Sequence, residues 1–149
     1  MLNKKTVFLA VKIELEKKIA QIQFAFDDLQ SALTSNTKSS AGDKHETGRA
    51  MAQLEQEKLS GQLNNLITLR NALSSIDPLE THDTVRYGSL VKTNQGIFFL
   101  SIGLGKIEIG ETKVFCLTPT TPLGKTLLGK SKDDVFTFNL NSDAILEVE

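Results

Sequence analysis

Residue types that usually carry chemistry are scarce in this chain of 149 residues. It has no tryptophan, one tyrosine, three prolines and a single cysteine, Cys116. A lone cysteine excludes an internal disulfide, and its apolar neighbours predict a buried core thiol, which fits a reducing compartment. The two histidines, His45 and His82, lie in polar stretches and provide neither a Cys/His metal pattern nor a Ser-His-Asp arrangement. The sequence therefore gives no support for an independent enzyme.

An excess of charge of one sign is also missing. The net charge is −1, with ten Lys and Arg against nine Asp and Glu in residues 1–77, and seven against nine in residues 78–149. A protein that binds nucleic acid alone usually has a clear basic excess, so we expect contact with nucleic acid only through a larger partner. No apolar run is long enough to span a bilayer, and Lys12 and Glu14 interrupt the one near the N-terminus. These features predict a soluble, cytoplasmic protein.

The first half of the chain has a heptad pattern instead. Apolar residues recur at steps of three and four along a segment that has no glycine or proline before Gly42, and a second series follows. A polar stretch near residues 35–42 separates the two series, which predicts an antiparallel two-helix coiled coil over residues 1–77. The alternative, a partner helix from a second chain, is disfavoured by the turn, so we expect a monomer. The first series is Phe8, Val11, Leu15, Ile19, Ile22, Phe26, Leu29 and Leu33; the second is Ala52, Leu59, Leu63, Leu66, Leu69, Leu73 and Ile76.

Two acids lie where the second helix is expected to begin. Asp43 is a good N-cap residue, and Glu46 three positions later would complete a capping box. The same two carboxylates at an exposed turn also suit Mg²⁺, which takes one or two protein carboxylates and keeps several waters. Alone they make a poor metal site, but they can supply the missing ligands of a site for which a partner protein provides the others. Capping and a shared Mg²⁺ both stay open from the sequence, and His45 between the acids has no assigned role.

Residues 78–149 change to short segments rich in Val, Ile and Phe, typical of strands. Thr121 as N-cap, Pro122 at the first position and Gly129 just past the end predict one short helix among them. Five phenylalanines, at positions 98, 99, 115, 136 and 138, are assigned to the core of the sheet. The fold class is therefore α+β, a two-helix coiled coil followed by a small β-sheet domain with one helix. The predicted strands are Ser89–Lys92, Gly96–Ile102, Lys113–Thr118, Val135–Leu140 and Ile145–Val148.

Taken together, the order of these parts and three short motifs resemble the bacterial Gre transcript-cleavage factors. Gly42-Asp43-x-x-Glu46 resembles the tip motif of that family. The segment from Thr121 to Lys130 resembles the Ser-Pro-leading segment of its C-terminal domain, and Ala144–Val148 resembles its last strand. The resemblance covers most of the chain.

The resemblance implies an FKBP-like C-terminal domain and binding to RNA polymerase at its secondary channel. The coiled coil would enter the channel, where Asp43 and Glu46 would help to hold the second catalytic Mg²⁺ of the polymerase and its attacking water. Thr121 and Pro122 would lie in the loop that binds the channel rim. The protein would need no cofactor of its own, since the Mg²⁺ belongs to the polymerase and the acids would stimulate the polymerase's own cleavage of backtracked RNA.

The chain departs from the family pattern at several positions. Thr121 replaces the usual Ser, Thr47–Ala50 differs from the usual residues after the second acid, and Asp133 stands where a Gly is common. These differences keep open a regulator that occupies the channel without cleavage. Two further classes of function also stay open: a folding helper or prolyl isomerase, which needs an aromatic-lined pocket, and a structural coiled-coil adaptor.

Overall fold

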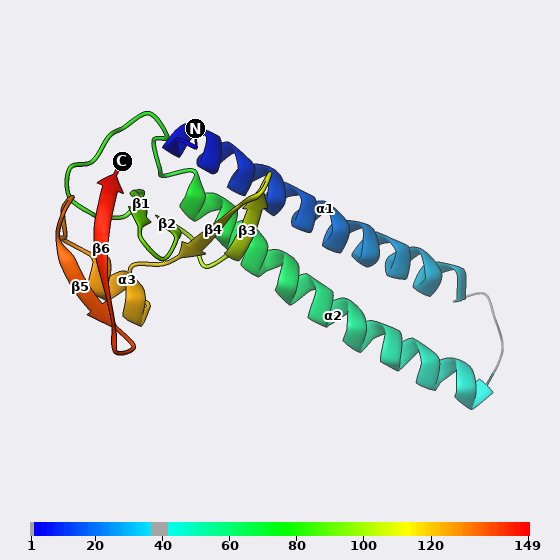
Figure 1. Ribbon diagram of the computed structural model, residues 1–149. Helices are drawn as coiled ribbons and strands as arrows, with labels where there is room; N and C mark the ends of the chain where they lie inside the picture. Colours follow the sequence, from blue (N-terminus) through cyan, green and yellow to red (C-terminus); the bar gives the residue numbers. More distant parts are fainter. Residues whose placement is uncertain (1, 37–41) are drawn as a thin grey trace. The chain divides into compact units, whose positions relative to one another are not determined.

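The computed structural model describes residues 2–36 and 42–149, and the side chains of residues 2–35 and 46–149. Two helices, α1 (Lys4–Asn36) and α2 (Gly42–Leu73), precede six strands and one short helix (Figure 1). The chain divides into two compact units. We call residues 15–68 the helix pair, and residues 1–14 with 69–149 the sheet unit. The domain boundary predicted from the sequence, between residues 77 and 78, differs from this division. It stays a prediction about which parts of the chain fold independently.

In the helix pair, α1 and α2 run antiparallel. The Gln56 side chain donates a hydrogen bond to Gln30 Oε1, and Ile22 of α1 and Leu66 of α2 line a shared hollow. Leu15, Leu33 and Leu59 are buried, but most other predicted seam residues are only half-buried. In a pair of helices without a third layer, each seam residue is covered only by the facing helix. Few side chains of this pair are therefore fully buried.

The sheet unit contains a six-stranded sheet in the order β3-β4-β2-β1-β6-β5. Neighbouring strands are antiparallel except β2 and β4, which are parallel. Helix α3 (Pro122–Leu127) contacts β5. The strands are β1 (Leu90–Thr93), β2 (Ile97–Leu100), β3 (Gly105–Ile109), β4 (Thr112–Leu117), β5 (Val135–Phe138) and β6 (Asn141–Val148).

Apolar residues of this sheet and α3 form one core. Its buried members are Val85, Val91, Leu100, Leu127, Phe136 and Ile145. The start of α1 belongs to the same unit, and Val7 and Val11 are fully buried. The Lys4 backbone N–H donates to Glu149 Oε2 at 3.1 Å, which fixes this segment to the end of β6. The α+β fold class predicted from the sequence is confirmed.

Three details of the sequence prediction are wrong. Strand β3 is absent from the predicted strands, because its five residues include only two apolar ones. The strand predicted over Val135–Leu140 ends at Phe138, since Asn139 and Leu140 have positive φ and form the turn to β6. Phe115 is 40% exposed instead of buried, because alternation along β4 points Val114 and Cys116 inward and Phe115 outward.

Candidate functional sites

The first candidate site is the start of α2. The helix begins at Gly42, so Asp43 lies within the first turn and not at the predicted N-cap position. Positions 43 and 46 are three apart on one helix and therefore share a face. The Glu46 side chain is exposed. The side chains of Asp43 and His45 lie outside the described ones, so the predicted metal-binding role of the two acids stays a prediction.

Gly48, in the next turn of α2, faces open space. A Cβ placed there would meet no atom of the described residues within 4 Å. Glycine in a helix is less favourable than alanine by roughly 0.5–1 kcal/mol, so this residue weakens the helix without serving any packing among the residues that the structure describes. The surface around Gly48 is correspondingly open to close approach by another molecule.

The second candidate site is the segment that starts α3. Thr121 caps the helix: its Oγ1 accepts a hydrogen bond from the Gly124 N–H at 3.1 Å and donates one to the Thr118 carbonyl at 2.8 Å. A Cβ on Gly124 would lie 2.3 Å from that same carbonyl oxygen and 2.9 Å from Pro119 Cα. The cap therefore requires both a hydroxyl at 121, which either Ser or Thr supplies, and glycine at 124.

Of the two residues predicted to bind a partner here, Thr121 is half-buried, and its hydroxyl already donates one hydrogen bond and accepts another within the chain. Pro122, the first residue of α3, is exposed. The structure thus separates a residue that shapes the loop from one that a partner can touch.

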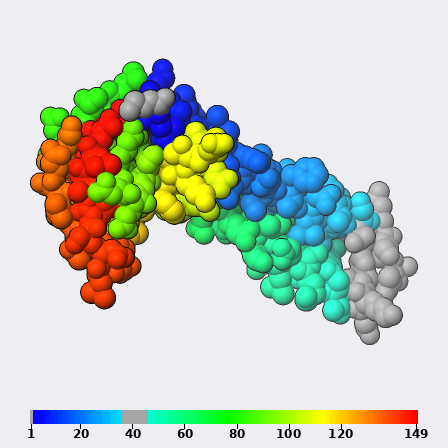
Figure 2. All heavy atoms as spheres, in the orientation of Figure 1, coloured from blue at the N-terminus to red at the C-terminus, as the bar shows by residue number. Residues whose placement is uncertain are grey.

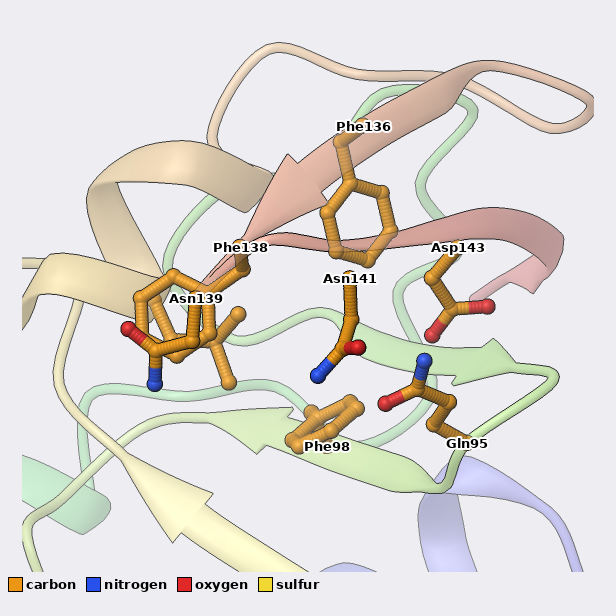
Figure 3. A pocket seen from close by; sticks show the side chains of 8 residues that line it. Gln95, Phe98, Phe136, Phe138, Asn139, Asn141 and Asp143 are labelled. Atoms are coloured by element: carbon orange, nitrogen blue, oxygen red, sulfur yellow. The ribbon is translucent and has the colours of Figure 1, made fainter.

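The third site is a hollow of about 170 Å³ beside α3, which the sequence does not predict. Figure 3 shows the rings of Phe98, Phe136 and Phe138 around it, with Asp143 at one side and Asn141 pointing into it. Its eight lining residues include one carboxylate and no basic side chain. The other lining residues are Gln95, Leu123 and Asn139.

Asp143 holds its charge at this hollow. Its Oδ1 accepts hydrogen bonds from the backbone N–H groups of Ala144 at 2.7 Å and Asn94 at 3.0 Å. Burial alone would raise the pKa of this carboxyl group, but these hydrogen bonds and one from Thr93 outweigh it and lower the pKa. The hollow therefore combines aromatic faces with a fixed negative charge.

A buried polar cluster surrounds His82, for which the sequence predicts a polar loop. His82 is only 6% exposed, its Nδ1 lies 2.6 Å from Ser89 Oγ, and its Nε2 lies 3.8 Å from Glu80 Oε2. Glu80, His82 and Ser89 thus follow one another as in the catalytic triad of a hydrolase. Ser89 is completely buried, however, and its Oγ also accepts a hydrogen bond from the Arg86 N–H at 2.9 Å. A nucleophile needs access to its substrate, so the cluster stabilises the loop before β1 and does not form a hydrolase site.

The same cluster places two positive charges next to His82, one on the buried Lys4 and one on the exposed Arg86. Lys4 Nζ donates to the Glu80 carbonyl at 2.6 Å, and Arg86 pairs with the Glu80 carboxylate. Burial lowers the pKa of His82, and the charges of Lys4 and Arg86 lower it further, against the opposite influence of Glu80. His82 is therefore held neutral at physiological pH, and its neutral form belongs to the folded state.

Cys116 is buried in β4, as predicted, and burial raises the pKa of its thiol to about 12. Among the side chains that the structure describes, no three His, Cys, Asp or Glu residues gather as a metal site. Within those same residues, no helix is both long and apolar enough to cross a membrane.

No protein-family model and no curated protein matches the chain. Among solved structures, a chain described as the transcription factor Gfh1 aligns over 93% of this chain and 93% of its own length, with 16% identity and a TM-score of 0.38. A TM-score this low carries no argument about function. The chain is thus defined by its own fold, an antiparallel helix pair and a six-stranded sheet unit with one short helix.

Proposed function

We propose that this protein is a transcription elongation factor that binds RNA polymerase and stimulates cleavage of backtracked RNA through Asp43 and Glu46. The observation that carries the proposal is the position of these acids at the start of α2, next to the connection between two antiparallel helices of 33 and 32 residues. At 1.5 Å per residue such helices are roughly 50 Å long, enough to carry a terminal turn deep into a channel. The resemblance of the sequence motifs to the Gre factors suggests RNA polymerase as the partner.

The chemistry fits two carboxylates at this place. Phosphodiester cleavage by a two-metal mechanism needs a second cation and an oriented water, and carboxylate oxygens are the ligands that Mg²⁺ prefers. Positions 43 and 46, three residues apart, can present two carboxylates on one face of α2. The protein then contributes ligands to a metal site of the polymerase and has no complete active site of its own.

Substitutions that keep size and remove charge test this role. The double variant Asp43→Asn and Glu46→Gln should remain folded and bind core RNA polymerase, yet lose most of its stimulation of transcript cleavage on stalled complexes. Raising Mg²⁺ should restore part of the loss, because the acids act by increasing occupancy of the second metal. The matched control is Glu55→Gln with Glu57→Gln, which removes two exposed charges from α2 away from its start.

The outcomes distinguish cleavage from simple occupation of the channel. Full cleavage by the Asn/Gln double variant at low Mg²⁺ would falsify the role of the acids. A wild-type protein that binds polymerase and blocks nucleotide entry without stimulating cleavage would instead be a channel-occupying regulator, which the unusual residues Thr47–Ala50 would then explain.

One observation favours a second candidate function, a folding helper. The phenylalanine-lined hollow is the kind of aromatic pocket that binding of an apolar or prolyl side chain requires, although the sequence assigns its phenylalanines to the core of the sheet. Catalysis of prolyl isomerisation in a model peptide by wild-type protein, abolished in Phe136→Ala but unaffected by Glu46→Gln, would support this candidate over the first.

A further inference from the structure

The turn between β5 and β6 contains an unusual leucine. Phe138 pairs with Asn141, which leaves Asn139 and Leu140 as a two-residue loop with φ of 51° and 67°. Turns with two positive φ values normally use Asn followed by Gly, because a side chain at the second position is strained in the left-handed region. Asn139 fits this rule, whereas Leu140 stands where glycine is expected.

Nothing within the described chain compensates for this strain. Leu140 is 99% exposed, the highest value among the large apolar residues that the structure describes. The β5–β6 hairpin projects from the sheet unit, in orange and red in Figures 1 and 2. Glycine at this position would remove both the backbone strain and the exposed apolar surface. Residues held in sparsely populated backbone regions cluster at active sites, ligand clamps and switch regions, so the strain at Leu140 points to a function.

The immediate surroundings define the partner's chemistry. Asn139 and Asn141, on either side of Leu140, line the phenylalanine-lined hollow, where the largely buried Asp143 (8% exposed) is the one carboxylate and none of the lining side chains is basic. A cationic side chain with an aliphatic stem complements that combination, since the stem packs on the rings while the charge approaches the carboxylate.

We propose that Leu140 is the anchor by which the sheet unit docks on its partner. The partner surface offers an apolar socket for Leu140 and, next to it, a lysine or arginine that enters the hollow toward Asp143. This inference rests on the proposed function, because it takes that partner to be RNA polymerase. Leu140 then adds affinity, while the acids of α2 act only after docking.

The test measures binding to core RNA polymerase and thermal stability in the same set of variants. Leu140→Gly should bind at least tenfold more weakly and unfold at a higher temperature than the wild type, because it removes the anchor and the strain together. Leu140→Ala should also bind at least tenfold more weakly but unfold near the wild-type temperature, because it keeps the positive φ.

Two matched controls isolate each effect. Asp133 also has a positive φ, of 73°, so Asp133→Gly should raise stability without changing affinity. Leu79 is another exposed leucine of the sheet unit, at 70%, so Leu79→Ala should leave affinity unchanged. Asn141→Lys should weaken binding by placing a like charge where the partner's cation enters, whereas Asn141→Gln should not.

Three results would overturn the proposal. If wild-type protein binds and both Leu140 variants bind as tightly, Leu140 is not an anchor, and the proposed function stands. If Asn141→Lys binds as tightly as wild type, the cation does not enter the hollow. If wild-type protein fails to bind the polymerase at all, the proposed function fails, and this docking assignment fails with it.

Discussion

The same substitution, glycine to alanine, should have opposite effects at two helical positions of this chain. In an open helix the change stabilises by roughly 0.5–1 kcal/mol, and a Cβ at Gly48 would meet no described atom within 4 Å, so Gly48→Ala should gain about that amount. At Gly124 the new Cβ would lie 2.3 Å from the Thr118 carbonyl oxygen, which is backbone and cannot rotate away.

The cost at Gly124 follows from what must move. Relieving the overlap separates the start of α3 from Thr118 and breaks the two hydrogen bonds of Thr121, each worth about 1 kcal/mol. Strain from overpacking adds roughly 1–3 kcal/mol. We therefore expect Gly124→Ala to lower the stability of the sheet unit by about 3–5 kcal/mol.

Differential scanning calorimetry on the full chain measures both changes. For a domain of this size, each kcal/mol shifts Tm by roughly 4–8 °C, so Gly124→Ala should lower the transition of the sheet unit by more than about 10 °C. Hydrogen exchange of the α3 amides should increase in parallel. A Gly124→Ala variant as stable as the wild type, or a Gly48→Ala variant that is less stable, would refute the packing argument.

The remaining predictions concern the helix pair and two buried side chains. Leu59→Ala should cost about 2–5 kcal/mol, as for buried leucines, whereas Ile22→Ala should cost clearly less because Ile22 borders a hollow; urea unfolding followed by circular dichroism compares them. Because the folded-state pKa of His82 is lowered, its contribution to stability is complete above about pH 6.5 and falls as the pH drops below that value, until the folded pKa is reached. His82→Asn should flatten that dependence in unfolding measured from pH 7.5 to 5, and an unchanged slope would contradict it. Cys116 should react with a thiol reagent only as fast as the sheet unit unfolds, and rapid reaction of the native protein would show that the thiol is accessible.

Periodicity predicts the helices well because their signal extends over many residues. Steps of three and four identify both α1 and α2, and the absence of glycine and proline in α1 allows its full length. Periodicity does not predict that Ile22 and Leu66 border a hollow, because burial depends on how many other elements cover a seam. Sequence spacing defines a helix face but not what lies against it.

Short-range signals fail where the chain breaks a local rule. The β5–β6 turn lacks the glycine that would mark it, so the local pattern extends the strand through Leu140. Asp133 shows the same effect: it occupies a position of positive φ, which explains why glycine is common there in the family that the sequence resembles. The burial of His82 depends on Lys4 and Ser89, which are distant in sequence or inconspicuous, and no local pattern indicates it.

The hydrogen bond from Lys4 to Glu149 joins residues 145 positions apart, and Lys92 Nζ likewise binds the Leu2 carbonyl. During synthesis on the ribosome, the first turn of α1 cannot make these contacts until residues 92 and 149 have emerged, and Val7 and Val11 are buried in the same unit as residues 69–149. Contacts between such distant residues slow folding and prolong exposure of apolar surface. Chaperones that hold nascent apolar segments should bind this chain near its N-terminus. Fragments that begin at residue 78 should also expose the surface that Val7 and Val11 cover.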